Sequence, residues 1–184
     1  IQSNDKFGDM RALCDHIHGL GLKAGIYSTP WITSYAGFVG GSSDDPQGAW
    51  QRPRTPRDGW RYGKHFFEAS DARQWAEWGF DYVKYDWGVD SVEVTRRMVE
   101  ALAACDRDIV LELSNSVPLA QAAEHTRLAH LSRTTGDLVD LWDRSQMDPG
   151  LRRWAVGIRE VWLAHDAWAS HQRPGHWNHA CNLR

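Results

Sequence analysis

The stretch EASDARQWAEWGFDYVKYD, residues 68–86, decides the fold. Residues 68–78 favour a helix, and Gly79 is a typical helix stop. The apolar run at residues 80–86 then predicts a strand that ends in Lys84 and Asp86. The stretch is therefore one helix followed directly by one buried strand, with charged side chains where the strand ends.

The same alternation of helix and strand extends along the whole chain. Helices are predicted at residues 9–20, 68–78, 91–105, 118–129 and 149–169, and strands at residues 22–28, 80–86, 108–114, 131–137 and 175–178. The last helix is expected to begin at Asp148 and Pro149, because a capping side chain followed by proline is typical of a helix start. The strands are continuous apolar runs, which indicates a parallel sheet covered by helices.

Two kinds of parallel sheet fit this order: an open doubly wound sheet and a (β/α)8 barrel. No G-x-G-x-x-G motif follows a strand, which disfavours the nucleotide-binding open sheet. Polar residues gather at the carboxyl ends of the strands, where barrel enzymes build their active sites. We therefore predict an α/β fold, a partial (β/α)8 TIM barrel with about five of eight strand–helix units. Residues 1–184 would form one partial catalytic domain, with residues 29–67 as a long Trp-, Pro- and Gly-rich loop insertion.

Composition narrows the function classes. The net charge is −3 and the basic residues are scattered, which argues against nucleic acid as the main partner. No apolar run is long enough for a transmembrane helix. The three cysteines, Cys14, Cys105 and Cys181, are widely spaced and are expected to be buried free thiols. Most of the 11 tryptophans are expected in the core or as loop anchors, although tryptophan also offers a flat platform for sugar rings.

Two aspartates, Asp86 and Asp137, lie at predicted strand ends. Paired carboxylates at one rim suit glycoside hydrolysis, although either could instead cap a turn. Lys84 is two residues before Asp86, so both should point to the same side and the lysine would favour the ionised carboxylate. Arg133 is four residues before Asp137 and could bind substrate hydroxyls or form a structural ion pair.

The nine histidines raise the question of a metal site. His16 and His18 lie on a predicted helix, where neighbours at this spacing diverge. His176 and His179 lie near a strand end without an obvious carboxylate partner, and no H-E-x-x-H motif occurs. We predict no metal and no cofactor, with a metal-dependent hydrolase using His176 and His179 as an alternative.

Four segments of the chain resemble glycoside hydrolase family 27, the retaining α-galactosidases and α-N-acetylgalactosaminidases. They are KFGDMRALCDHIHGLGLKAGIYS at residues 6–28, WAEWGFDYVKYDWG at 75–88, SRTTGDLVDLW at 132–142 and RPGHWN at 173–178. They occur in the family's order and with family-like spacing, spread across most of the chain. The resemblance implies a catalytic barrel that, in the family, is followed by a β-sandwich; the chain is therefore expected to be an internal fragment of a longer protein.

The resemblance also implies a role for each matching residue. Asp86 falls on the family's nucleophile and Asp137 on its acid/base, which implies double displacement with carboxyl groups about 5–5.5 Å apart. Tyr27, Lys84 and Arg133 fall on residues that contact the sugar. The implied activity is hydrolysis of terminal α-galactosides.

Departures from the family pattern leave the sugar specificity open. Ser114 and Asn115 replace a cysteine–glutamate pair that helps to read the sugar's 2-position, and His179 and Cys181 replace the two aspartates of the family's WNDPDM. Ser114, Asn115 and Trp31, the tryptophan nearest the first strand end, are counted with the substrate-binding residues. A β-L-arabinopyranosidase, an α-N-acetylgalactosaminidase, an α-1,6-glucan-releasing relative and an inactive sugar-binding barrel remain alternatives.

The partner expected from these observations is an oligosaccharide or glycoside substrate, with neither nucleic acid nor membrane involved. By resemblance, a bacterial enzyme is expected, either exported or cytoplasmic. The sequence does not decide the oligomeric state.

Overall fold

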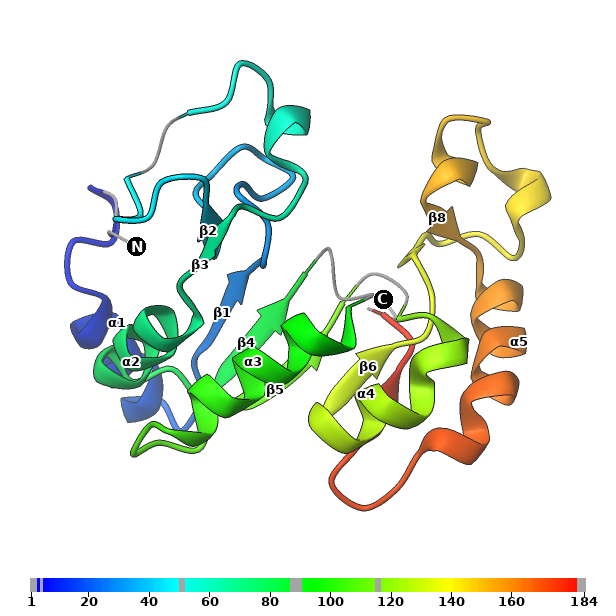
Figure 1. Cartoon of the computed structure of the whole chain (residues 1–184). Coiled ribbons are helices and arrows are strands. Elements are labelled where there is room, and N and C mark those ends of the chain that lie inside the picture. The colour runs from blue at the N-terminus through cyan, green and yellow to red at the C-terminus, as the bar shows by residue number, and fades with distance from the viewer. Residues whose placement is uncertain (1–2, 4, 50–51, 87–90, 115–116, 182–184) are drawn as a thin grey trace. The chain divides into compact units, whose positions relative to one another are not determined.

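The computed structural model describes every residue except 1–2, 4, 50–51, 87–90, 115–116 and 182–184. The chain divides into two compact units, Ile1–Leu111 and Glu112–Arg184. Within each unit helices and strands alternate along the chain, as the sequence predicts (Figure 1).

The first unit is built on two parallel strands. Its main elements are α1 (Met10–Gly19), β1 (Gly25–Ser28), α2 (Glu68–Trp78), β4 (Tyr82–Tyr85) and α3 (Val92–Ala103). Strand β1 pairs with β4 in parallel, with Gly25 opposite Tyr82 and Ser28 opposite Tyr85. Helix α2 packs against both α1 and α3.

The second unit holds three parallel strands. Strand β5 (Val110–Leu113) crosses the division between the units and is followed by η2 (Leu119–Gln121), α4 (Ala122–Leu128), β6 (Leu131–Arg133), α5 (Ile158–Trp168), η5 (Ala169–His171) and β9 (Trp177–His179). Strand β6 lies in the middle, since it pairs in parallel with β5 through Glu112 and Leu113 and with β9 along its whole length. The prediction of an α/β fold with parallel strands is therefore confirmed.

The junction between α2 and β4 forms as its sequence predicts. Helix α2 ends at Gly79, which adopts the left-handed conformation with φ 92° that glycine reaches without steric cost. Trp75 of α2 is fully buried. In β4, buried Val83 and Tyr85 alternate with half-buried Tyr82 and Lys84. This alternation leaves Lys84 on the less buried side of the strand.

The described residues between β1 and α2, 29–49 and 52–67, form a folded excursion. Its strands β2 (Ser42–Ser43) and β3 (His65–Phe66) pair antiparallel, and a short helix η1 (Pro56–Gly59) lies between them. The carbonyl of Gly41 accepts a hydrogen bond from the Phe67 N–H at 3.0 Å, immediately before α2 begins. This bond joins the last residue of the excursion, Phe67, to Gly41 in its first arm.

The prediction of a helix that starts at Pro149 is wrong for the residues before Ile158. The carboxylate of Asp148 accepts a bond from the Gly150 N–H at 2.8 Å and closes a turn instead. The chain then forms η4 (Leu151–Arg153) and β8 (Ala155–Val156), which pairs in parallel with β7 (Asp137–Leu138). Helix α5 begins only at Ile158, where the Glu160 carboxylate accepts from the Gly157 N–H at 3.0 Å.

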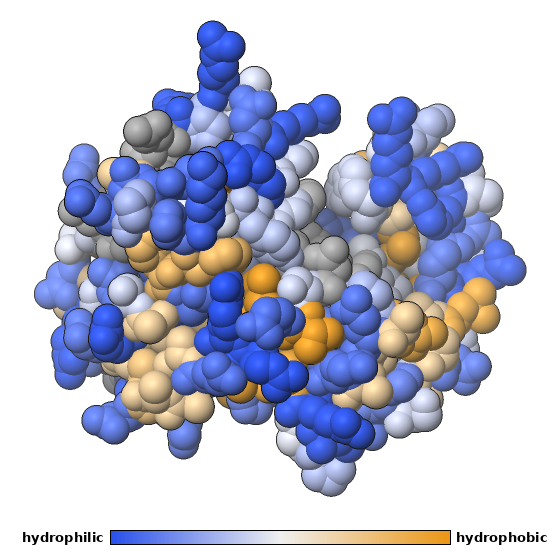
Figure 2. All heavy atoms as spheres, in the orientation of Figure 1, coloured by the Kyte–Doolittle hydropathy of each residue, from blue (hydrophilic) through white to orange (hydrophobic). Residues whose placement is uncertain are grey.

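The expectation that all three cysteines are buried needs correction. All three cysteines are free, but only Cys14 is buried, while Cys105 and Cys181 are half-buried. Among the described tryptophans, Trp75 and Trp168 are buried, Trp31, Trp60 and Trp78 are half-buried, and Trp142, Trp154, Trp162 and Trp177 are exposed. Figure 2 shows hydrophobic residues at the surface over α5, where Ile158, Trp162 and Leu163 are exposed. No helix in the described part of the chain has the length and apolarity to cross a membrane.

Asp81 organises the amino-terminal end of β4. One carboxylate oxygen accepts bonds from His18 Nε2 at 2.7 Å and from the Ala24 N–H at 2.9 Å, and the other accepts from Arg107 Nη2 at 2.7 Å. Burial opposes ionisation, but these hydrogen bonds outweigh it and lower the pKa of Asp81 to about 2. The network ties α1, β4 and the segment before β5 together at the end of the strand opposite Asp86.

We expect Asp81→Asn to lower the free energy of unfolding at pH 7 by about 1–2 kcal/mol, after allowance for solvent screening. Because the folded pKa is depressed, the stabilisation is present above about pH 4 and is lost between about pH 4 and pH 2. Urea unfolding of the intact protein at both ends of that range measures it. Asp15→Asn, which removes an exposed carboxylate from α1, is the control. Identical pH profiles for the two variants would contradict the assignment.

Candidate active site

Three of the predicted site residues lie together at the carboxyl end of the first unit's strands. Tyr27 of β1 and Lys84 of β4 are register partners, so their side chains are neighbours on one face. The Asp86 N–H donates to the Ser28 carbonyl at 2.8 Å, which continues the parallel pairing one step beyond β4. Asp86 is buried, with 5% of its surface exposed, while Tyr27 and Lys84 are half-buried.

Trp31 lies just beyond this strand end, at the start of the excursion. It forms an isolated antiparallel bridge with Tyr62. Its N–H donates to the Thr29 hydroxyl at 3.3 Å, and its carbonyl accepts from the Ser42 N–H at 3.3 Å. The backbone at Trp31 is therefore fixed by both arms of the excursion.

The other polar cluster belongs to the second unit and centres on Arg133. This arginine ends β6 and is almost fully buried, with 2% of its surface exposed. Its guanidinium donates to the Ser114 hydroxyl at 3.0 Å, to the Thr135 carbonyl at 3.3 Å and to Asp137 Oδ1 at 2.6 Å. Ser114, Arg133 and Asp137 are thus brought together, whereas Asn115 lies outside the described residues.

The position of Asp137 differs from the prediction. Strand β6 ends at Arg133, and Asp137 begins the separate strand β7. It caps no helix, because the chain continues from it into β7. Its side chain is 49% exposed, so Arg133 orients one carboxylate oxygen while the carboxyl group keeps access to solvent. A carboxyl group that exchanges protons with a substrate and with water needs both properties.

A buried glutamate paired with a half-buried histidine lies beside this cluster and is missing from the sequence-based prediction. His179 Nδ1 and Glu112 Oε1 are 2.5 Å apart, and Glu112 is only 2% exposed. His179 is the register partner of Arg133. Glu112 lies on β5, two residues before Ser114. The sequence shows no obvious carboxylate motif beside His179, and the fold supplies Glu112 as its partner. The sequence offers one signal of this pair, a glutamate inside the apolar run of β5. The partner of that glutamate is distant in the sequence.

A second histidine adjoins this pair. The Thr134 N–H donates a hydrogen bond to the His179 carbonyl at 3.1 Å. The Thr134 hydroxyl contacts His165 Nδ1 at 3.0 Å. Burial and the neighbouring His179 lower the pKa of His165, which favours a neutral ring there.

His176, the other histidine of the alternative metal site, has a structural contact in the core. It is fully buried, and its Nδ1–H donates to the Ala129 carbonyl at 2.6 Å. Burial lowers its pKa, so the neutral ring is favoured. Across the described ranges, no group of three or more His, Cys, Asp or Glu side chains is arranged to hold a metal ion.

A parallel α/β sheet with carboxylate, lysine, tyrosine and arginine side chains at the carboxyl ends of its strands is typical of enzymes whose active site lies at that edge. No protein-family profile matches the sequence. Individual proteins, however, match it over most of its length.

Two curated α-galactosidases are similar to this chain. α-Galactosidase A of Cellvibrio japonicus is 29% identical over 189 residues, which span 97% of this chain and 39% of that protein. α-Galactosidase 2 of Arabidopsis thaliana is 30% identical over 173 residues, which span 92% of this chain and 35% of that protein. The chain therefore spans well under half the length of these relatives.

Solved structures agree on the fold. α-Galactosidase I of Mortierella vinacea superposes with a TM-score of 0.70 at 24% identity, over 94% of this chain and 42% of that one. A family 27 β-L-arabinopyranosidase of Geobacillus stearothermophilus superposes with a TM-score of 0.63 at 24% identity, over 92% and 40% of the two chains. The resemblance to the α-galactosidases of glycoside hydrolase family 27 is thus confirmed across most of the chain.

Proposed function

We propose that this chain carries the catalytic residues of a retaining glycoside hydrolase of family 27 that cleaves terminal α-galactosides. One observation carries the proposal. The two motifs of the resemblance, Lys84 to Asp86 and Arg133 to Asp137, begin in the last residues of parallel strands, in a chain that matches α-galactosidases over more than nine-tenths of its length. Residues 1–184 would be part of one (β/α)8 catalytic domain, with residues 29–67 as an insertion in it.

Asp86 is the proposed nucleophile. Its carboxylate attacks the anomeric carbon of the sugar, and the bond to the leaving oxygen breaks as the ester to the enzyme forms. Burial of Asp86 supports this role, since a poorly hydrated carboxylate is a stronger nucleophile and is shielded from competing water. The neighbouring Lys84 would favour the charged form of the carboxylate that the attack requires.

Asp137 is the proposed acid and base. It gives its proton to the leaving oxygen in the first step, and in the second step it takes a proton from the water that attacks the anomeric carbon. That second attack releases Asp86 as a free carboxylate, so the enzyme ends the cycle unchanged. The 2.6 Å bond from Arg133 supports this role, because it fixes the direction of the carboxyl group.

The remaining site residues would bind the sugar. Tyr27 and Lys84 would donate to its hydroxyl groups from β1 and β4. Arg133, held by Ser114 at 3.0 Å, would contribute from β6, and Trp31 would border the ring. Ser114 and Asn115 occupy the positions where the family reads the sugar's 2-position, so they would set the preference there.

One alternative substrate has an observation in its favour. The chain superposes on a family 27 β-L-arabinopyranosidase with a TM-score of 0.63. L-Arabinopyranose has the ring of galactose without its hydroxymethyl group, so the same catalytic pair could act on both. The ratio of kcat/KM for aryl α-galactoside to that for aryl β-L-arabinopyranoside decides between them.

Proton NMR of the reaction tests the mechanism. Double displacement inverts the anomeric carbon twice, so the galactose first released should be the α anomer, followed by slow mutarotation. Release of the β anomer by the intact protein would contradict the retaining mechanism. Binding of glycosides without turnover of any of them would favour the inactive sugar-binding barrel.

A further inference from the structure

A tight hairpin at residues 32–40 projects from the start of the excursion; we call it the aromatic hairpin. Its arms are joined by hydrogen bonds from the Ser34 N–H to the Phe38 carbonyl at 2.9 Å and from the Gly40 N–H to the Ile32 carbonyl at 2.8 Å. The turn closes at Gly37, whose φ of +80° favours glycine. The hairpin is thus a defined structure with a short tip.

The aromatic hairpin is held rigidly from below. Thr33 is fully buried, its N–H donates to the Gly59 carbonyl at 3.1 Å, and its hydroxyl donates to the Pro56 carbonyl at 3.2 Å. Trp60 Nε1 donates to the Ser34 carbonyl at 3.3 Å. A Cβ atom on Gly59 would lie 2.2 Å from the Thr33 hydroxyl, so the two segments are in close contact.

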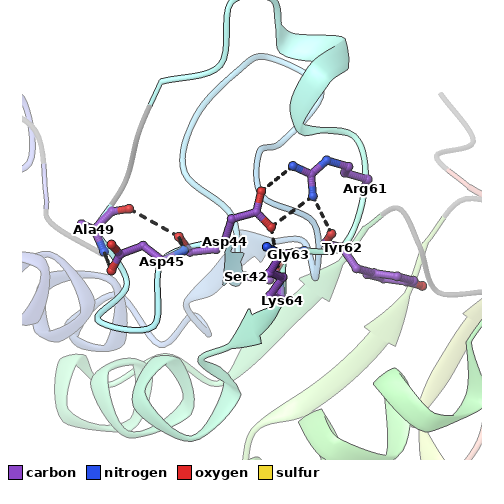
Figure 3. A network of polar contacts seen from close by, with 9 residues as sticks. Ser42, Asp44, Asp45, Ala49, Arg61, Tyr62, Gly63 and Lys64 are labelled. Carbon is purple, nitrogen blue, oxygen red and sulfur yellow. Dashed lines mark hydrogen bonds and ion pairs between the residues drawn. The ribbon is translucent and has the colours of Figure 1, made fainter.

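A polar network supports the same region (Figure 3). Arg61, whose carbonyl accepts from the Ile32 N–H at 3.0 Å, makes a two-pronged ion pair with Asp44 at 2.5 and 3.2 Å. Asp44 also accepts from the Lys64 N–H at 3.3 Å, and the Ser42 hydroxyl accepts from the Gly63 N–H at 2.9 Å. Both arms of the excursion are therefore tied to the base of the aromatic hairpin.

The tip exposes two large aromatic side chains. Tyr35 is 57% exposed and Phe38 is 72% exposed. The ring of Tyr35 also meets the ring of Tyr27 edge to face, with centroids 6.2 Å apart and planes at 87°. Tyr35 therefore extends the aromatic surface outward from the strand end that carries Tyr27, Lys84 and Asp86.

The chemistry of the tip indicates a neutral ligand with an apolar face. Residues 34–39, SYAGFV, include no charged side chain. A pyranose ring matches this surface, because its axial C–H groups pack on an aromatic face while its hydroxyl groups stay hydrated or bond to the tyrosine hydroxyl. Because hydrogen bonds already join the two arms of the hairpin, its backbone loses little conformational entropy when such a ligand binds.

We propose that Tyr35 and Phe38 form a binding subsite for the sugar residue on the leaving-group side of the scissile bond. This inference rests on the proposed function, because the strand end beside Tyr27 must first hold the terminal sugar. The subsite makes the protein selective for oligosaccharides over glycosides with small leaving groups.

Two substrates test the subsite in the intact protein: raffinose, whose leaving group is a disaccharide, and α-galactosyl fluoride, whose leaving group has no ring. Tyr35→Ala and Phe38→Ala should each lower kcat/KM for raffinose about 10-fold and change kcat/KM for the fluoride less than about twofold. Tyr35→Phe, which keeps the ring, should retain most of the activity on raffinose. Trp162→Ala, which removes a more exposed aromatic side chain from α5, should affect neither substrate.

The outcomes separate the inference from the proposed function. If Tyr35→Ala lowers activity on both substrates equally, Tyr35 acts by positioning Tyr27, and the subsite is wrong. Unchanged activity of both variants on raffinose would also overturn it, with the proposed function intact. An intact protein that hydrolyses neither substrate would overturn the proposed function and this inference with it. Melting temperatures should change little, because Phe38 is 72% exposed and Tyr35 loses only its edge contact with Tyr27.

Discussion

Asp86→Ala is expected to reduce kcat on an aryl α-galactoside by at least about 1,000-fold, because the nucleophile of a double displacement has no substitute in the site. The loss should appear in kcat rather than in KM, since the carboxylate forms its bond in the reaction and adds little to ground-state binding. Added azide should restore part of the turnover. Azide can enter the space that the carboxylate leaves and attack the anomeric carbon in its place, giving a β-galactosyl azide.

The control for Asp86→Ala is Asp108→Ala, which removes an exposed carboxylate just before β5. It should keep kcat within about twofold, in line with other exposed substitutions. Thermal unfolding of both variants verifies that they fold. An Asp86→Ala variant that is folded and retains more than about a tenth of the activity would remove Asp86 from the mechanism.

Asp137→Asn should show a second, substrate-dependent loss. An amide cannot give a proton to the leaving oxygen, so kcat/KM should fall about 1,000-fold on raffinose, whose leaving group is an alcohol. Fluoride leaves without that proton, so kcat/KM on α-galactosyl fluoride should stay within about tenfold of the native value. The asparagine oxygen can still accept the bond that Arg133 donates to Asp137 Oδ1 at 2.6 Å, which preserves the geometry.

Asp140→Asn is the matched control for this variant, because Asp140 is exposed and lies three residues further along the same segment. It should hydrolyse both substrates at the native rate. Equal losses of Asp137→Asn on raffinose and on the fluoride would show that the carboxyl group does not act as the acid.

The helices and strands around the site were predictable because their signals are local. Helix α2 occupies Glu68–Trp78 with Gly79 as its stop, and β4 follows at Tyr82–Tyr85, within the predicted strand. The apolar runs alone placed Tyr27 and Lys84 at strand ends. Their register, with each residue opposite the other, required the three-dimensional pairing of β1 with β4.

The segment from residue 134 to residue 157 was not predictable in the same way. Asp148 and Pro149 carry a helix-start pattern, yet the carboxylate bonds to Gly150 and closes a turn. The short pairing of β7 with β8 then takes the residues that would have continued the helix. Here the pairing of β7 with β8, two segments that are separated in the sequence, outweighs the local preference for a helix.

Contacts between side chains on different strands could not be predicted in full from the sequence either. The Arg133–Asp137 pair could be expected from its spacing, and the structure adds Ser114 as a third member. Glu112 pairs with His179, which is far away in the sequence. The sequence around either residue does not indicate this contact. The contact between Tyr27 and Tyr35 likewise depends on the fold of the aromatic hairpin.

The most direct test of the central claim is to trap the covalent intermediate. A fluorinated α-galactosyl fluoride suits this, because the ring fluorine slows both steps while the fluoride leaving group lets the first step proceed. Peptide mapping of the inactivated intact protein by mass spectrometry then locates the sugar. We predict one labelled peptide, with the galactosyl ester on Asp86. A label on any other residue, or inactivation without a covalent sugar, would contradict the account.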